Sequence, residues 1–231
     1  MGRKENLYAR EIIEYYKSLE IQKFIIADNN RPGEEKFSDV LQDYINNGIV
    51  DLIPLFGSSL GLSEYYEIVY EYYRNICDWM TFFDFDEFFY MHDKDKKLNL
   101  REFLSKERYN KCEALIFNWL IYGDNDLVHY DNRSLLKRFT KPDFKNPDNV
   151  IVKTIVKGNL SIPIFEPKKS NHVPIKNLYI CDSKGNKINR YNPFSIRPTN
   201  FDYAYVIHLS TKTAEEYVEK TKKGKTRNIT E

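Results

Sequence analysis

The stretch Trp79-Met-Thr-Phe-Phe-Asp-Phe-Asp-Glu-Phe-Phe-Tyr90 places two carboxylates, Asp84 and Asp86, in a run that is otherwise almost entirely aromatic or apolar. A carboxylate in such surroundings is costly unless something neutralises it. We predict a buried strand here, in which alternate residues face the same side about 7 Å apart. Asp84 and Asp86 would then point the same way and share one hard cation beside a phosphate, although D-x-D triplets also arise by chance on solvated loops.

Composition narrows the class of protein. The chain has 231 residues, which is enough for one large domain or two small ones, and a formal net charge of +1. This near-neutral charge lacks the excess of basic residues that is typical of nucleic-acid-binding proteins, so no nucleic-acid partner is expected. No uninterrupted apolar run approaches the roughly 18 residues of a membrane span.

Cysteine usage and the N-terminal sequence bear on the compartment. Cys77, Cys112 and Cys181 are widely spaced and form no C-x-x-C pair, so we expect free buried thiols in a reducing compartment. The opening residues Met-Gly-Arg-Lys-Glu-Asn lack the apolar core of a signal peptide. We therefore predict a cytoplasmic protein, with peripheral association at the inner face of the membrane left open.

Periodicity predicts an alternation of strands and helices in the first half of the chain. We expect helices at 6–19, 37–46 and 63–75, the last with Ser63 as its N-cap, and strands at 22–28, 49–55 and 79–90. This order is typical of a mostly parallel α/β sheet with helices on both faces. The second half is expected to contain a helix at 100–108, a strand at 112–121, an irregular region at 142–198, a strand at 203–209 and a helix at 213–222.

Three segments together resemble the GT-A-fold glycosyltransferases of the family 2-like and family 92 group. The opening segment runs from Arg3 to Asn30, the central one is Asp78-Trp-Met-Thr-Phe-Phe-Asp-Phe-Asp-Glu-Phe89, and the closing one is Ile207-His-Leu-Ser-Thr-Lys-Thr-Ala-Glu-Glu-Tyr-Val-Glu-Lys220. They occur in the family's order and span nearly the whole chain. The resemblance implies a single GT-A domain over 1–231, with a nucleotide-sugar-binding half at 1–111 and an acceptor-side half at 112–231.

The resemblance also implies a reaction and a cofactor. Relatives transfer a sugar from a nucleotide-sugar to an acceptor with inversion, which here suggests a UDP-hexose donor and a glycan or lipid-linked saccharide acceptor. They hold Mn²⁺, or Mg²⁺, against the donor diphosphate with the D-x-D carboxylates. Asp84 and Asp86 match those carboxylates, and His208 falls where a third metal or diphosphate ligand is found. No oligomeric state is implied.

Several other residues receive roles from the same resemblance. Glu5 and Asp28 fall where relatives contact the nucleoside, although a helix-entry acid and a turn residue are the plainer interpretations. Lys212 is expected to contact the donor phosphate, as is Lys153. His172 is a candidate for phosphate or acceptor contact.

An inverting displacement needs a carboxylate base on the acceptor hydroxyl. Asp124, in the loop Tyr122-Gly-Asp-Asn-Asp126, is the first candidate and Asp126 is its rival, while both also suit simple turn acids. Trp119 offers a face for an acceptor sugar, and a core tryptophan is equally consistent with the sequence.

One departure and two rival functions remain open. Relatives carry a hydrophobic strand directly before the opening segment, which here follows Met1-Gly2, so we expect the first strand of the sheet to be missing. A truncated, inactive nucleotide-sugar-binding protein is one rival. A metal-dependent nucleotidyltransferase or phosphatase is the other, although Asp86 is followed by Glu-Phe rather than the x-Thr that haloacid-type phosphatases require.

Overall fold

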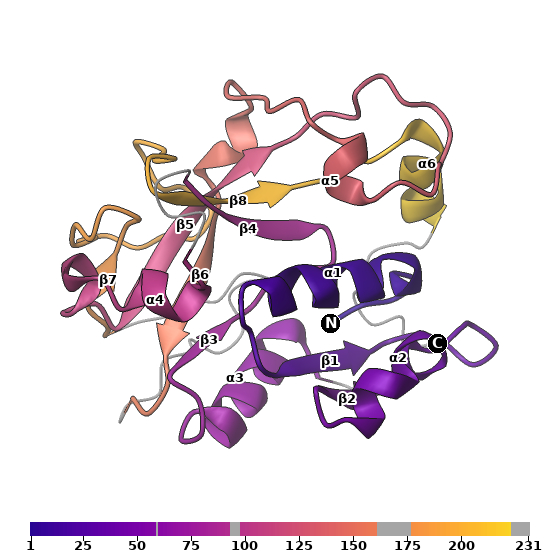
Figure 1. Ribbon diagram of the computed structural model, residues 1–231, viewed down its shortest axis with the longest axis horizontal. Coiled ribbons are helices and arrows are strands. Elements are labelled where there is room, and N and C mark those ends of the chain that lie inside the picture. The colour runs from indigo at the N-terminus through magenta and orange to yellow at the C-terminus, as the bar shows by residue number, and fades with distance from the viewer. Residues whose placement is uncertain (59, 93–97, 161–176, 223–231) are drawn as a thin grey trace.

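The computed structural model describes residues 1–58, 60–92, 98–160 and 177–222, and its strands form two separate sheets (Figure 1). The smaller sheet pairs β1 (Phe24–Asp28) with β2 (Val50–Pro54) in parallel. Helix α1 (Asn6–Ser18) precedes β1 in the chain, and α2 (Phe37–Asn46) connects β1 to β2. The prediction of a helix at 37–46 is confirmed, and the predictions at 6–19, 22–28 and 49–55 are confirmed to within two residues at either end.

The larger sheet has the order β3-β6-β5-β8-β4, with a short β7 beside β5. Its strands are β3 (Trp79–Thr81), β4 (Glu87–Met91), β5 (Ala114–Ile121), β6 (Val152–Lys157), β7 (Ile180–Cys181) and β8 (Ala204–His208). The pairs β3–β6, β5–β6 and β4–β8 are antiparallel, whereas β5 pairs in parallel with β7 and β8. The prediction of a mostly parallel sheet is therefore wrong for this sheet, because an apolar run indicates burial and not the direction of the neighbouring strand.

The remaining helices are short or lie at the periphery. They are α3 (Leu62–Tyr73), α4 (Leu100–Leu104), α5 (Leu135–Arg138) and α6 (Ala214–Lys222), with 3₁₀ turns at Glu107–Tyr109 and Pro147–Val150. The N-cap of α3 is Gly61 and not Ser63, since the Glu64 carboxylate accepts the Gly61 N–H at 2.7 Å and fixes the start two residues earlier. Within the described residues, no helix is both long and apolar enough to cross a bilayer.

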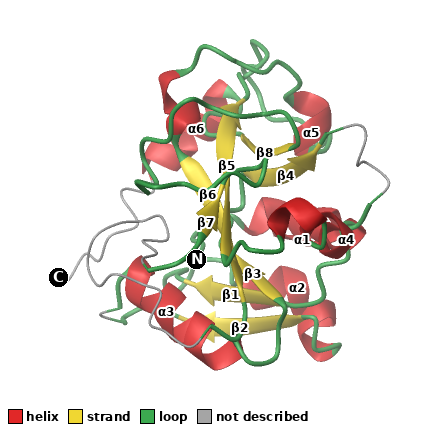
Figure 2. Cartoon of the chain, turned by 90° about the vertical axis from the view of Figure 1, so that its left-hand side faces the viewer, coloured by secondary structure: helices red, strands yellow, loops and turns green. Residues whose placement is uncertain are grey.

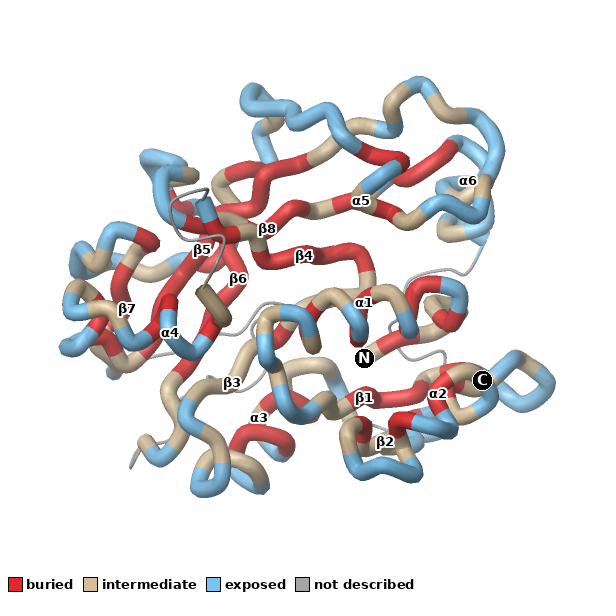
Figure 3. Tube along the Cα trace, viewed as in Figure 1, coloured by how far each residue is buried: buried red, intermediate tan, exposed pale blue. Residues whose placement is uncertain are grey.

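Helix α1 fills the space between the two sheets (Figures 1 and 2). Tyr8, Ile12 and Tyr16 pack into the core of the larger sheet with Phe88 and Phe89 of β4. The adjacent face of the same helix, with Ala9 and Ile13, packs against β1 and α2. One helix therefore contributes to two cores, and β5, which is buried along its whole length, lies at the centre of the larger one (Figure 3).

The D-x-D motif lies in a turn and not in a strand. The run 79–90 divides into β3 and β4, which lie at opposite edges of the larger sheet, and residues 82–86 connect them. The Glu87 N–H donates to the Asp84 carbonyl at 3.2 Å, and the Glu87 carboxylate accepts the Asp84 N–H at 2.9 Å. These bonds turn the chain within the motif, so the prediction of one continuous strand is wrong.

Two cysteines are joined, contrary to the expectation of free thiols. Cys112 and Cys181 form a disulfide although they are 69 residues apart in sequence. The pairing of β7 beside the start of β5 brings them together, an adjacency that sequence spacing alone does not indicate. Among the described cysteines, Cys77 is the free one.

Candidate active site

The ends of three adjacent strands position the candidate active site. Glu87 at the start of β4 lies opposite His208 at the end of β8, and His208 in turn lies opposite Ile121 of β5. The turn that carries Asp84 and Asp86 leads directly into β4. The Asp86 carbonyl accepts the N–H of Leu209 at 2.9 Å, which fixes the turn against the end of β8.

A buried lysine neutralises one end of the motif. The Lys153 ammonium, on β6, lies 2.8 Å from the Asp84 carboxylate and 3.1 Å from that of Glu87. The side chains of Lys153 and Glu87 are almost wholly enclosed, whereas that of Asp84 is 41% exposed. A buried cation between two acids is stable only through such pairing, so Lys153 is tied to this arrangement of charges.

Three basic side chains surround Asp86. The Lys220 ammonium lies 3.0 Å from its carboxylate, that of Lys212 lies at 3.9 Å, and Nε2 of His208 lies at 3.7 Å. Lys220 comes from α6 and Lys212 from the residues just before it, so the closing segment of the chain folds over the D-x-D turn. The prediction that His208 and Lys212 act on the donor diphosphate stays a prediction.

These charges set the protonation states of the acids. Burial alone would raise the pKa of Asp84, but the Lys153 ammonium outweighs it and the pKa falls below its ordinary value. Burial opposes ionisation of Asp86 as well, yet His208, Lys212 and Lys220 hold its pKa far below the usual range. Both aspartates are therefore carboxylates at neutral pH.

Glu87 and His208 are shifted towards their neutral forms. Burial raises the pKa of Glu87 to about 8 despite the nearby Lys153. Burial lowers the pKa of His208 to about 4, against the opposite effect of Asp86. A neutral imidazole is the form that binds metals.

The side-chain atoms around the D-x-D turn are of the kinds that bind a hard divalent cation. Carboxylate oxygens of Asp84 and Asp86 with an imidazole nitrogen are ligands that Mn²⁺ accepts. Nδ1 of His208 is shielded from solvent and makes no hydrogen bond within the described chain, so this imidazole has coordination capacity in reserve. In the described ranges, however, no three His, Cys, Asp or Glu side chains are already arranged as a metal site. Lysine ammonium groups provide the counter-charge instead.

The comparison with protein families covers the whole chain. The model of glycosyltransferase family 92 matches residues 1–231. The chain belongs to glycosyltransferase family 92. It is therefore a glycosyltransferase, with a nucleotide-sugar donor and a glycan acceptor. No curated protein matches it closely enough to narrow that description.

In this glycosyltransferase the two acids of the opening segment occupy different surroundings. Glu5 is the N-cap residue of α1, and its carboxylate lies 3.8 Å from the Lys212 ammonium, near the D-x-D turn. Asp28 is buried at the end of β1 and accepts the N–H groups of Asn30 at 2.8 Å and Phe37 at 3.0 Å. Both nucleoside roles stay predictions, and Asp28 has its carboxylate already committed to the backbone.

Trp119 borders the site from inside the core. Its ring lies 4.0 Å from that of His208, centroid to centroid, and the side chain is buried on β5. The core interpretation of this tryptophan therefore fits its position, and acceptor stacking stays a prediction. His172 lies outside the described residues.

The two candidate bases lie on the loop that follows β5. The Asp124 carboxylate accepts the N–H of Asp126 at 3.0 Å and shapes the turn, in which Asn125 and Asp126 have positive φ. The Asp126 side chain is exposed and pairs with Lys141 at 2.9 Å. Neither carboxylate contacts the D-x-D turn in the described part of the chain, so their catalytic roles stay predictions.

A second ion pair anchors α6 beside the site. Glu216 of α6 pairs with Arg138 of α5 at 2.8 and 3.1 Å, and it also accepts a hydrogen bond from the Tyr8 hydroxyl of α1. Both members of the ion pair are almost completely buried. Three helices that are distant in sequence meet at this carboxylate, which holds Lys220 within reach of Asp86.

Glu87 and Lys220 lie within the central and closing segments, but neither residue was predicted to belong to the site. A signal for Glu87 was available, because it follows D-x-D inside an aromatic run where a third acid is equally costly. Lys153 had the same signal, as a lysine within the apolar run Val150–Val156. The position of Lys220 depends on how α6 docks, which its local sequence does not indicate.

We expect Glu87→Gln to flatten the dependence of stability on pH. Between about pH 5 and 8 the folded protein keeps the Glu87 proton while the unfolded chain loses it, so wild-type stability falls as pH rises. The limit of this contribution is about 1.4 kcal/mol per pH unit. Denaturant unfolding of the wild type and the variant across this range measures the difference in their free energies of unfolding. His208 contributes with the opposite sign, but it is present in both proteins, so its contribution cancels in that difference. Parallel pH profiles would contradict the assignment.

Proposed function

We propose that the enzyme catalyses metal-dependent, inverting transfer of a hexose from a UDP-sugar to a saccharide or lipid-linked glycan acceptor. The observation that carries this proposal is the convergence of Asp84 and Asp86 with His208, Lys212 and Lys220 at neighbouring strand ends. Two ionised carboxylates suit a divalent cation, and the surrounding ammonium groups suit a diphosphate. The GT-A architecture and the D-x-D role form part of the same proposal.

Each group has a distinct task in the proposed reaction. Asp84, Asp86 and His208 would hold Mn²⁺ or Mg²⁺, which neutralises the charge that develops on the leaving diphosphate. Lys212, enclosed between Glu5 and the Tyr8 ring, supplies a fixed positive charge on the same side. Asp124, with Asp126 as the alternative, accepts the proton of the acceptor hydroxyl.

Of these three lysines, Lys153, Lys212 and Lys220, the last can move away most easily when a cation binds Asp86. Its side chain is 40% exposed, whereas those of Lys153 and Lys212 are almost completely buried. Its ammonium contacts Asp86 directly. Withdrawal of Lys220 would free a carboxylate oxygen without moving a buried charge.

Thermal unfolding with nucleotides tests the proposal. A panel of UDP-, GDP- and CMP-sugars, with and without Mn²⁺, is expected to show the largest rise in Tm for a UDP-sugar with Mn²⁺. Sugar transfer is then measured with the ligand that binds. A rise with Mn²⁺ alone, or equal rises for every nucleotide, would contradict donor recognition at this site.

His208→Ala is expected to lower turnover more than donor affinity. A ligand that neutralises the leaving diphosphate matters most in the transition state, where that charge develops. Lys212→Ala should weaken affinity and turnover together, because its ammonium attracts the diphosphate in both states. Initial rates over a range of donor concentrations separate kcat from KM. Wild-type turnover in both variants would show that the closing segment only packs.

The compartment is part of the proposal as well. We propose a cytoplasmic location, with the inner membrane face as a site of peripheral association. The Cys112–Cys181 disulfide bears on this point, since disulfides persist mainly in oxidising compartments. Thiol labelling of protein taken directly from cells measures its redox state, and a fully oxidised pair would argue for another compartment.

A further inference from the structure

A row of four aromatic rings crosses β8 and β4 of the larger sheet. Successive ring centroids lie 5.9, 5.8 and 5.0 Å apart, in the order Phe144, Phe201, Tyr205 and Tyr90. Tyr205 of β8 and Tyr90 of β4 are directly opposite each other in the antiparallel pair, so their side chains share one face of the sheet. Each ring lies within the range of favourable aromatic pairing with the next, so the row is continuous.

This row is only partly covered. Phe144 is 63% exposed, and Phe201, Tyr205 and Tyr90 each keep part of their surface exposed. A single exposed phenylalanine needs no explanation, but contiguous exposed apolar surface marks a site of interaction. The partly buried rings are held by their neighbours, so the row offers a preformed surface, which lowers the entropy cost of binding.

Tyrosine hydroxyls add hydrogen-bonding groups beside the rings. Burial and a side-chain hydrogen bond with Tyr122 raise the pKa of Tyr205, and the nearby hydroxyls of Tyr90 and Tyr15 act in the same direction. The Tyr15 hydroxyl donates to the Phe89 carbonyl at 2.7 Å. A sugar unit has an apolar C–H face and a rim of hydroxyl groups, so it matches a surface that combines aromatic faces with hydroxyls. None of the rings carries a charge at neutral pH, which favours neutral sugar units.

The row is joined to the loop that carries the two candidate bases. Tyr122 opens that loop, and its N–H donates to the His208 carbonyl at 3.2 Å. The segment that leads to Phe144 pairs with the same loop, since the Gly123 N–H donates to the Lys141 carbonyl at 3.0 Å. A glycan whose terminal hydroxyl reaches this loop can therefore continue along the row.

We propose that this aromatic row binds the sugar units behind the acceptor end of a neutral glycan, so that the acceptor is an oligosaccharide of several units. The proposal rests on the proposed function, which places the acceptor hydroxyl at the Asp124 loop. A glycan is the acceptor class that the family implies. The ring-to-ring spacing is comparable with the length of one sugar unit in an extended glycan, so successive units can cover successive rings.

Titration with neutral oligosaccharides tests the row. Maltohexaose, cellohexaose and chitohexaose are each compared with their monosaccharides by isothermal titration calorimetry, without nucleotide or metal. We expect at least one hexasaccharide to bind at least about tenfold more tightly than its monosaccharide, because linked units engage several rings at once. Phe144→Ala should weaken that binding at least about fivefold, whereas Phe144→Tyr keeps the ring and should retain it.

Phe56→Ala is the matched control for Phe144→Ala. Phe56 is 50% exposed in the turn after β2, and β2 lies across α1 from β8 (Figure 1). Both substitutions remove an exposed ring, so the Tm of each variant should stay close to that of the wild type. Hexasaccharide binding should be unchanged in the control.

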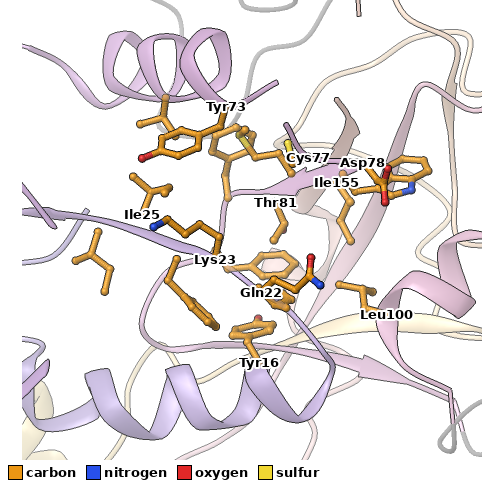
Figure 4. Close-up of a pocket in the computed structure, with 18 of the residues that line it drawn as sticks. Tyr16, Gln22, Lys23, Ile25, Tyr73, Cys77, Asp78, Thr81, Leu100 and Ile155 are labelled. Carbon is orange, nitrogen blue, oxygen red and sulfur yellow. The ribbon is translucent and has the colours of Figure 1, made fainter. Parts of the chain in front are cut away.

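A second aromatic-lined space has to be distinguished from the row. It is the cavity of about 670 Å³ between β1 and β3, which Tyr73 and Thr81 help to line (Figure 4). NMR spectra of the protein with the hexasaccharide separate the two locations. The amide shifts of Phe144 and Tyr205 should change on binding, and that of Thr81 should not.

The proposal would be overturned if no hexasaccharide bound, if Phe144→Ala bound as tightly as the wild type, or if the shifts mapped to the cavity. An equal loss in Phe56→Ala would overturn it as well. Because no nucleotide or metal enters these measurements, their failure would leave donor recognition untouched, and a failed donor panel would leave glycan binding at the row unchanged.

Discussion

Replacing Asp86 with alanine is expected to lower sugar transfer by at least about 10²-fold and to abolish Mn²⁺-dependent donor binding. The change removes a carboxylate that is ionised at neutral pH and faces three basic side chains. Loss of one preorganised electrostatic group at a reacting centre has effects of about this size. Transfer assays and titration with a UDP-sugar, each with and without Mn²⁺, measure the two effects.

Asp202→Ala is the matched control for this change. Asp202 is an exposed aspartate that also pairs with a lysine, Lys184 at 2.5 Å, and no contact links it to the D-x-D turn within the described residues. We expect the control to retain wild-type transfer. The Asp86 variant should still unfold cooperatively, since its closest cation, Lys220, is 40% exposed and can turn to solvent once the carboxylate is removed. Unchanged Mn²⁺-dependent affinity in that variant would refute the assignment of the motif.

Arg138→Met is expected to give the largest loss of stability, about 3 kcal/mol or more. Removing one member of a buried ion pair leaves the other charge uncompensated. Here that charge is Glu216, whose pKa is about 2 because Arg138, Tyr8 and Thr213 outweigh the effect of burial. This contribution is present above the unfolded pKa of Glu and is lost as pH falls towards 2. Denaturant unfolding at neutral pH measures the loss.

The control for Arg138 is Arg133→Met. Arg133 makes an equally short ion pair with Asp131, but at the surface, and such pairs contribute about 0–1 kcal/mol. The double change Arg138→Met with Glu216→Gln removes the uncompensated charge and should recover at least about 1 kcal/mol. If Arg138→Met and Arg133→Met were equally mild, the buried pair would not be what holds α6.

The positions of helices could be predicted from the sequence where an apolar periodicity ended at residues that favour a turn. The helix at 37–46 was predicted to the residue, since apolar periodicity and the following Asn and Gly give the same boundaries. The D-x-D run was misread as one strand, because its aromatic residues favour extended structure while hydrogen bonds from Glu87 impose a turn. Strand direction was misjudged for a related reason, since pairing partners are set by tertiary contacts.

The candidate site was predictable in part. The chemistry of Asp84 and Asp86 was visible because charge inside an apolar run needs compensation. The compensating groups, Lys153 and Lys220, come from elements about 70 and 134 residues away, as the separations of their hydrogen bonds show. Such partners depend on how distant elements pack, and a single sequence carries no direct record of that.

Helix α6 has a consequence for the ionic conditions in which the enzyme works. Its apolar side chains Tyr217 and Val218 are exposed, so polar contacts rather than apolar packing hold it in place. Salt screens exposed charges strongly and buried ones weakly. Rising ionic strength should therefore loosen the half-exposed Lys220 from Asp86 first, while the enclosed Arg138–Glu216 pair holds the other end. The helix would then pivot about its first turn, and the electrolyte around the protein would set how readily Asp86 becomes available.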